Sequence, residues 1–450
     1  MRHATSKQNY KLLIMKNFIN TLTLLLILLS SSLFAQVNYT AKDQVTIYND
    51  VFLFGSNFGY NPPWQDEDLA NIAAGNPALG IDGVGVKSSR PTLPGWFMEE
   101  YGYDFRLNTY QHYADLGLRD NVCIVGFPSD NQKETDQPCN GIQSEMFDNL
   151  YTDIWDGGAN GTPYNDDNYY AAYLYKTVSM YKQHVKFWEI WNEPGFDYSG
   201  NCGWREPGDP LCNWWDNDPD PCINKLRAPI QHYVRTLRIS WEIIKTLDPD
   251  AYVIVAGVGF PSFLDAILRN TDNPVDGSVT AEYPHGGGAY FDVMGFHSYT
   301  HFDGTMKYWD NSLGQFVYER HSDKGASGVL RRQDQYQAVL DNYGFNGTIF
   351  PEKEWIITEI NGPRKQFQDF VGSEEYQRNF LLKAAVVCMK SNIRAMHVYN
   401  LAERKTFNEA TGEFDLFGLY EKVKGTQPYN QVKTSEGVAY KTMSDLLFGS

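Results

Sequence analysis

The sequence predicts an α/β fold, a (β/α)8 TIM barrel, because strand-like and helix-like segments alternate along most of its 450 residues. Short apolar runs rich in β-branched and aromatic residues are candidate strands. We expect eight of them, at 51–58, 83–88, 122–127, 185–191, 252–257, 291–297, 355–359 and 395–400. Segments with helical spacing precede four of these runs, at 168–182, 223–247, 328–343 and 373–391. In the last of these, Ser373 stands just before two glutamates, which is typical of a helix start.

We expect a single domain over residues 36–450, because the chain shows no internal repeat, low-complexity linker or break in composition. Two long polar segments, 128–167 and 195–222, interrupt the alternation directly after strand ends. Because the segments that follow barrel strands lie at one face of the barrel, both loops are expected to cover that face.

Residues 1–35 are typical of a secretory signal peptide. An apolar run at 22–29 follows the basic Lys16 and precedes a serine-rich stretch that ends at Ala35, where we expect cleavage. Met15 is a second candidate start, since residues 1–14 add nothing that a signal peptide needs. The apolar run is too short to cross a bilayer, and no cysteine follows it to carry a lipid. The sequence therefore predicts a secreted or periplasmic protein without a membrane anchor.

The charge of the chain excludes some partners. It carries 38 basic and 55 acidic residues, a net charge of −17. Such a surface repels nucleic-acid phosphates and anionic membranes, so we expect neither as a partner. The cysteine spacings match no zinc-binding pattern, and we expect no metal ion and no cofactor.

The six cysteines fall into two groups. Four of them lie in the long polar loops, at Cys139, Cys202, Cys212 and Cys222. Cys123 lies in an apolar strand and Cys388 in an apolar helix. Because export permits disulfides, we expect the four loop cysteines to form two bridges and the other two to stay reduced. Three pairings of four cysteines are possible, and the sequence does not choose among them.

Two glutamates stand at the tips of candidate strands. Glu193 ends an apolar, aromatic run that stops at a proline, and Glu359 ends a second run that is followed by Asn361-Gly362-Pro363. In a closed barrel such carboxylates face each other across its mouth. Glycoside hydrolysis uses a pair of this kind, with a proton donor whose pKa is raised by burial and by the neighbouring carboxylate. The alternative is that Glu193 caps a helix or belongs to a buried ion pair.

The two segments resemble a known group of enzymes. Residues 191–194, Trp-Asn-Glu-Pro, resemble the acid/base motif on strand four of the retaining clan A glycoside hydrolases. Residues 357–359, Ile-Thr-Glu, are similar to the strand-seven nucleophile of that clan. The resemblance covers about residues 169–399. It is nearest to glycoside hydrolase family 39, in which a Tyr-Lys helix end, here Tyr181-Lys182, leads into the strand-four motif.

The resemblance implies a role for each matching residue. Glu193 would be the general acid/base, Glu359 the nucleophile, and Asn192 would bind the sugar 2-hydroxyl. Tyr299 would hold the carboxylate of the nucleophile, and His297 would line the same subsite.

Two further matches are less direct. Arg90 resembles the strand-two arginine of the clan, although a loop ion pair is an alternative for it. Tyr399 stands where many members of the clan place a tryptophan under the reacting sugar, so either Tyr399 takes that place or the floor of the sugar site is different.

Aromatic residues are abundant, with 30 Tyr, 26 Phe and 11 Trp, and flat rings stack on the apolar faces of sugars. Trp204, Trp214 and Trp215 follow the acid/base strand in the cysteine-rich loop. They either stack on the leaving-group side of a carbohydrate substrate or pack beneath the loop, and both readings stay open.

We therefore expect a secreted retaining β-glycosidase that hydrolyses a polysaccharide or oligosaccharide by double displacement. One alternative is an exo-acting, β-xylosidase-like enzyme, and another is a non-catalytic carbohydrate-binding protein on a degenerate barrel. A lipase-type hydrolase is disfavoured. The run His285-Gly286-Gly287-Gly288 resembles an oxyanion loop, but the chain has no Gly-x-Ser-x-Gly elbow to work with it.

Overall fold

The structure is a computed structural model that describes residues 36–425 and 430–449. The proposed signal peptide, residues 1–35, lies outside the described residues. In the described part, none of the helices combines the length and the hydrophobicity needed to cross a membrane.

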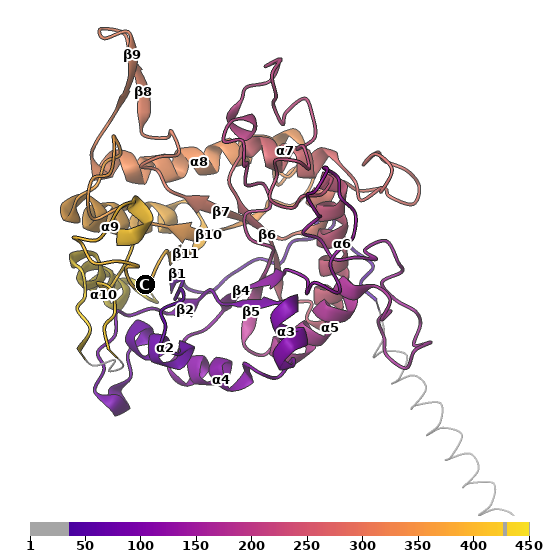
Figure 1. Cartoon of the computed structure of the whole chain (residues 1–450), viewed down its shortest axis with the longest axis horizontal. Helices are drawn as coiled ribbons and strands as arrows, with labels where there is room; N and C mark the ends of the chain where they lie inside the picture. Colours follow the sequence, from indigo (N-terminus) through magenta and orange to yellow (C-terminus); the bar gives the residue numbers. More distant parts are fainter. Residues whose placement is uncertain (1–35, 426–429, 450) are drawn as a thin grey trace, which may run out of the picture.

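A sheet of nine strands, all paired in parallel, occupies the centre of the molecule (Figure 1). Its strands are β1 (Leu53–Ser56), β2 (Ser88–Ser89), β3 (Thr92–Pro94), β4 (Asn121–Gly126), β5 (Val185–Ile190), β6 (Tyr252–Val258), β7 (Val293–Ser298), β10 (Glu354–Ile360) and β11 (Ile393–Val398). They follow one another in the order β2-β1-β11-β10-β7-β6-β5-β4-β3.

The two ends of this order meet, because β2 and β3 are halves of one barrel strand. Only Arg90 and Pro91 separate them, and proline has no N–H to donate to a ladder. Even there the backbone stays bonded on both sides. Arg90 N donates to Ser56 O of β1 over 3.3 Å, and Ile124 N of β4 donates to Pro91 O over 3.0 Å. The sheet therefore closes into an eight-stranded parallel barrel, and the prediction of an α/β barrel is confirmed.

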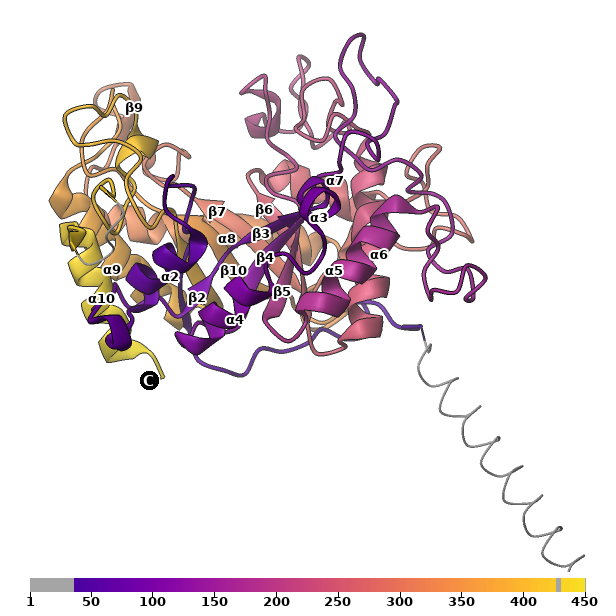
Figure 2. The same cartoon turned by 60° about the horizontal axis from the view of Figure 1, so that its bottom comes forward.

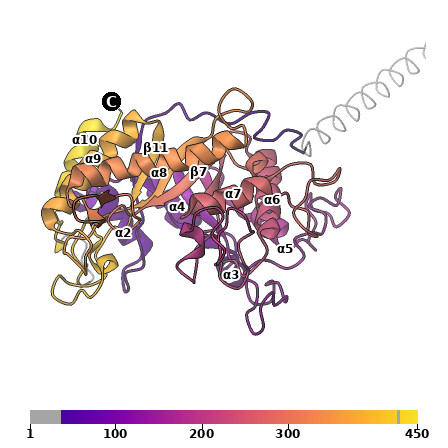
Figure 3. The ribbon, with the colours of Figure 1, turned by 90° about the horizontal axis from the view of Figure 1, so that it is seen from above.

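Helices surround the strands, as Figure 1 shows, and α8 lies beside α9 (Figure 3). Their bounds are α2 (Asp66–Ala74), α3 (Gly95–Tyr101), α4 (Leu107–Asp115), α5 (Tyr169–Tyr181), α6 (Ile230–Leu247), α7 (Pro261–Arg269), α8 (Ser322–Asn342), α9 (Glu374–Lys390) and α10 (Ser435–Leu447). All four predicted helices are present. The Ser373 hydroxyl caps α9 by accepting a hydrogen bond from Tyr376 N over 3.0 Å.

The second strand was predicted too early in the chain. The segment 83–88 is not a ladder strand except at its last residue, because Gly83 and Gly85 adopt left-handed φ angles of 62° and 79°. Val84 and Val86 are buried, but their N–H groups donate to carbonyls at the end of α2. A buried apolar run has the same sequence pattern whether its backbone pairs with a strand or packs on the end of a helix.

The interior of the barrel changes character along its axis. At the amino ends of the strands it is apolar, with one cluster that takes a residue from most strands, including Leu53, Val122 and Phe187. Toward the carboxyl ends the buried side chains are polar, among them Arg90 and Glu189. The polar end is where a site can form, because buried polar groups need partners.

The long loops leave the barrel at its carboxyl end, because each follows a strand. Figure 2 shows them rising on the same side as the hairpin of β8 (Lys307–Asp310) and β9 (Gln315–Tyr318), which follows β7. Disulfides join Cys139 to Cys222, one from each loop, and Cys202 to Cys212. Cys123 and Cys388 are buried free thiols, so the prediction for the cysteines is confirmed.

Candidate active site

The proposed site residues come from four barrel strands. Glu193 lies three residues beyond the end of β5, and Glu359 is on β10. His297 is on β7 and Tyr299 directly follows it. Arg90 lies in the interruption between β2 and β3. All five therefore stand at the carboxyl end of the barrel.

The backbone that carries Glu193 is held in a rare conformation. Trp191 and Glu193 have φ angles of 78° and 50°, which residues with a Cβ seldom adopt. Trp191 is buried, its ring lies 4.7 Å from that of Phe127, and its N–H donates to Val125 O over 2.9 Å. Tertiary packing thus holds a strained turn that directs the Glu193 side chain, as happens at functional sites.

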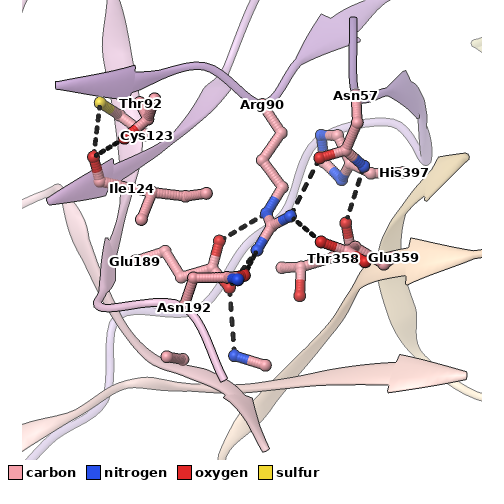
Figure 4. A network of polar contacts seen from close by, with 12 residues as sticks. Asn57, Arg90, Thr92, Cys123, Ile124, Glu189, Asn192, Thr358, Glu359 and His397 are labelled. Carbon is pink, nitrogen blue, oxygen red and sulfur yellow. Dashed lines mark hydrogen bonds and ion pairs between the residues drawn. The ribbon is translucent and has the colours of Figure 1, made fainter. Parts of the chain in front are cut away.

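Arg90 links the polar groups of the site (Figure 4). Its Nε and Nη2 donate to the two oxygens of Glu189 over 2.6 and 3.0 Å. Its Nη1 donates to Glu359 Oε1 over 2.7 Å and to Asn57 Oδ1 over 2.9 Å. Its Nη2 also donates to Asn192 Oδ1 over 2.8 Å. Burial lowers the pKa of Arg90, but the two carboxylates hold it above its usual value, so the guanidinium remains a fixed cation.

Glu359 is held from its other side by Tyr299. The phenol hydroxyl donates to Glu359 Oε2 over 2.6 Å. The Tyr299 ring is stacked on those of Phe302 and Phe417, at 5.5 and 5.7 Å between centroids, which limits its movement. Burial and then the Glu359 charge raise the pKa of Tyr299 well above its usual value. Tyr299 therefore stays a protonated donor, and both oxygens of Glu359 accept strong hydrogen bonds.

Glu193 has different surroundings. Its Oε1 lies 2.9 Å from His297 Nδ1, and its Oε2 lies 3.6 Å from Lys225 Nζ. Burial raises the pKa of Glu193, but the hydrogen bond to His297 and the cation of Lys225 bring it down to about 2. The raised pKa expected from the sequence is therefore wrong for the protein without a substrate. The reason is that His297 and Lys225, both distant in the chain, stabilise the ionised form more than burial destabilises it.

His297 stands between the two carboxylates. Its Nδ1 is also 3.6 Å from Glu359 Oε2, and its Nε2 faces Arg90 Nη2 at 3.4 Å. Because arginine can only donate, a neutral imidazole in this position would carry its proton on Nδ1, facing Glu193, and its lone pair on Nε2, facing Arg90. A Cβ on residue 257 would come within 2.1 Å of His297 Nε2, so Gly257 leaves the space that the ring occupies.

The two carboxylates are close together. One oxygen of Glu193, one of Glu359 and a ring nitrogen of His297 all lie within 4.8 Å of one another. Three such atoms could also hold a metal ion. However, Arg90 already bonds to Glu359 and Lys225 stands beside Glu193, so fixed cations supply the positive charge that an ion would bring.

A cavity of about 1040 Å³ opens beside these groups. Arg90, Asn192, Glu359 and Tyr399 line its inner end. The Tyr399 hydroxyl bonds to Arg404, and its ring remains at the cavity. The structure thus brings Arg90, Asn192, His297, Tyr299 and Tyr399 to the two glutamates.

The three tryptophans of the cysteine-rich loop lie elsewhere, since none of them is among the described residues that line this cavity. Trp214 is buried against Phe260 and Phe263, which is the packing alternative that the sequence left open. Trp215 is half-buried and also packs against the core. Trp204 keeps 45% of its surface exposed, with the Arg332 guanidinium over its ring at 4.8 Å.

Sequence reasoning missed Glu189, Asn57 and Lys225. Glu189 is fully buried, and its Oε1 also accepts from Gly257 N over 3.1 Å. Alternation along a strand could have found it, because Phe187 and Glu189 of β5 point to the same side. For Lys225 the sequence held no such signal, since only the fold of the loop brings it to Glu193.

Comparisons with known proteins give structural likeness alone. No family model matches the chain, and no curated protein matches it. Among solved structures, the virulence factor SghA from Agrobacterium tumefaciens is similar, with 13% identity and a TM-score of 0.48, over 88% of this chain and 97% of that one. A β-glucosidase from Thermotoga maritima, in complex with castanospermine, has 13% identity and a TM-score of 0.48, over 89% and 99% of the two chains. Function must therefore come from this chain's own geometry.

Proposed function

We propose that this protein is a retaining β-glycosidase that hydrolyses a polysaccharide or oligosaccharide by double displacement. The observation that carries the proposal is the pair of carboxylates, Glu193 after β5 and Glu359 on β10, with oxygens within 4.8 Å of each other. Retaining enzymes hold the two groups about 5–5.5 Å apart, whereas inverting enzymes separate them by about 6.5–9.5 Å to admit a water.

Glu359 is suited to be the nucleophile. Arg90 and Tyr299 donate hydrogen bonds to its two oxygens and hold the carboxylate in place. In the first step a Glu359 oxygen attacks the anomeric carbon, the bond to the leaving oxygen breaks, and Glu193 gives that oxygen a proton. In the second step Glu193 takes a proton from water, which attacks the same carbon and releases Glu359.

Glu193 must gain a proton before the first step, although it is ionised in the free protein. The gap of 3.6 Å to Lys225 Nζ is longer than a hydrogen bond, and about a third of the Glu193 side chain is exposed. A sugar that fills this space removes water from the carboxylate and so raises the pKa of Glu193. Once Glu359 has become a neutral ester, one negative charge nearby is gone, which favours the ionised base for the second step.

Asn192 and Tyr399 are suited to bind the reacting sugar. The amide oxygen of Asn192 faces Arg90, which leaves its NH₂ group to donate to a sugar hydroxyl. Tyr399 offers a ring at the wall of the cavity beside Glu359. The two disulfides support secretion or a periplasmic location, because bridges persist in oxidising compartments.

The proposal is tested by two variants on a panel of plant and algal polysaccharides and aryl-glycosides. Glu359→Ala should abolish turnover and regain it with azide, since the small anion can replace the carboxylate. Glu193→Ala should act only on substrates whose leaving group needs no proton. Glu352→Ala, an exposed glutamate just before β10, is the matched control and should behave as the wild type.

Four results would contradict this function. Wild-type rates in either variant on a natural glycan would remove the assigned roles. An inverted first product in proton NMR would remove the double displacement. Saturable sugar binding without any hydrolysis would favour the non-catalytic alternative, and activity on aryl-β-xyloside with none on any polymer would favour the exo-acting one.

A further inference from the structure

The cavity extends well beyond the catalytic carboxylates. Pockets that bury drug-sized ligands measure about 300–1,000 Å³, and this one measures about 1040 Å³. Its inner end holds Glu359 and Asn192, so a single sugar there would leave the outer part empty. The volume fits a chain of sugar units.

Two walls enclose the outer part of the cavity. One wall is the segment 58–67, which follows β1 and includes Tyr60. The other is formed by the start of α3 and by residues before α4, with Trp96, Phe97 and Phe105.

The rings on these walls are exposed although they are apolar. Trp96 is 46% exposed, Phe105 is 54% exposed, and Tyr60 is 89% exposed. Such a group of rings on the surface marks a place where something binds. A sugar presents a flat face of C–H groups, which stacks on an aromatic ring without loss of its hydroxyl hydrogen bonds.

The second wall is rigid. Phe97 is packed between its neighbours, with centroids 5.5 Å from Trp96 and 5.3 Å from Phe105. The backbone N–H of Trp96 donates to Phe127 O over 3.1 Å, which links the start of α3 to the end of β4. A stacking surface held in place in advance loses little entropy when a ligand binds.

The charges of the outer cavity disfavour acidic sugars. Asp66 and Glu67 line it. Among the described residues that line the cavity, the lysine and arginine cations are Arg90 and Arg106. Arg90 is bound to carboxylates and Arg106 is paired with Asp66, so neither is free to receive an anionic group. A uronate or a sulfate would be desolvated there without a counter-charge.

We propose that Trp96, Phe105 and Tyr60 form outer subsites for neutral, β-linked sugar units on the glycone side of the bond that is cut. Glu359 and Asn192 line the cavity, whereas Glu193, the proton donor, is not among its lining residues. Sugars in the cavity therefore belong to the part that becomes attached to Glu359. The inference rests on the proposed function and deepens it, because an enzyme with several glycone subsites acts within chains or on oligosaccharides.

The test compares substrates of different length. The probes are an aryl-glycoside with one sugar and neutral oligosaccharides of two to six units, prepared from the polysaccharide that the wild type cuts fastest. In Trp96→Ala and in Phe105→Ala we expect kcat/KM to fall about 2- to 12-fold for the six-unit probe, because one lost ring contact is worth about 0.5–1.5 kcal/mol. The aryl-glycoside should be cut at the wild-type rate.

Two further variants separate a binding role from a folding role. Tyr60→Ala removes a ring that is almost fully exposed, so its fold should be unaffected while the six-unit probe loses rate. Trp309→Ala removes a ring that is 51% exposed, close to the exposure of Trp96, from the β8–β9 hairpin; Trp309 does not line the cavity, and its loss should change nothing.

The outcomes are distinct for the two proposals. Equal losses on the aryl-glycoside and on the six-unit probe, or no loss on either, would refute the outer subsites while hydrolysis itself persisted. Tighter binding of a uronic-acid oligosaccharide than of a neutral one by Glu359→Ala would refute the neutral class. A wild type that hydrolyses no polysaccharide and no aryl-glycoside would refute the proposed function and the subsites with it.

Discussion

Replacing Arg90 with methionine should strongly destabilise the protein. Glu189 is fully buried, and Arg90 supplies two of the hydrogen bonds to its carboxylate, over 2.6 and 3.0 Å. Removing one partner of a buried ion pair typically costs about 3–5 kcal/mol, because the remaining charge is left without compensation. We expect a decrease of this size in the free energy of unfolding, measured in urea at pH 7.

The double variant Arg90→Met with Glu189→Gln identifies the cause. With no charge left at position 189, about half or more of the lost stability should return, while Glu359 still lacks its arginine. The matched control is Arg394→Met, which breaks the Arg394–Glu354 pair at the other end of the barrel. The Arg394 side chain is 28% exposed, against 1% for Arg90, so water can partly replace it and its loss should cost less than the loss of Arg90.

Two results would refute this reasoning. A decrease below about 1 kcal/mol in Arg90→Met would show that Glu189 finds other compensation. An additive double variant, as unstable as the sum of the single ones, would show that the pair is not coupled.

Three other perturbations have defined outcomes. Tyr299→Phe removes one hydrogen bond to the charged Glu359, worth about 1.5–3 kcal/mol, so kcat/KM should fall roughly 10- to 100-fold on any cleaved substrate. An unchanged kcat/KM would show that Tyr299 has no part in catalysis. Lys225→Met should raise the pKa of Glu193 from about 2, which moves the basic limb of the kcat/KM profile to higher pH for poor leaving groups. Since the pKa of Glu193 is depressed from 4.5 in the folded state, the contacts of Glu193 stabilise the protein above about pH 4.5 and lose their effect as the pH falls toward 2. Lys225→Met should therefore lose less stability than the wild type over this pH range. Identical acid unfolding of the two proteins would contradict the role of Lys225. Cys139→Ser should destabilise the protein by about 2 kcal/mol more than Cys202→Ser, because the two bridges span 83 and 10 residues and the longer loop gains more entropy on unfolding. Equal losses of stability in thermal unfolding would mean that loop entropy does not set the contribution of these bridges.

The sequence by itself determined the features that depend on local pattern. Apolar runs at the strand period, bounded by Gly and Pro, located seven of the eight barrel strands. The bridged cysteines were distinguished from the free ones because the former lie among polar residues and the latter among apolar ones. Glu193 and Glu359 were visible because each carboxylate interrupts an apolar run at its end.

Only the tertiary structure decided the electrostatics of the site and the walls of the cavity. The ionised state of Glu193 depends on His297 and Lys225, which reach it from other parts of the chain. The pairing of Arg90 with Glu189 also depends on residues that are distant in the chain. So do the burial of Trp214 and the exposure of Trp96. The physical reason is that a pKa and an exposed surface are set by whatever packs around a group, and in a closed barrel those neighbours come from strands far apart in sequence.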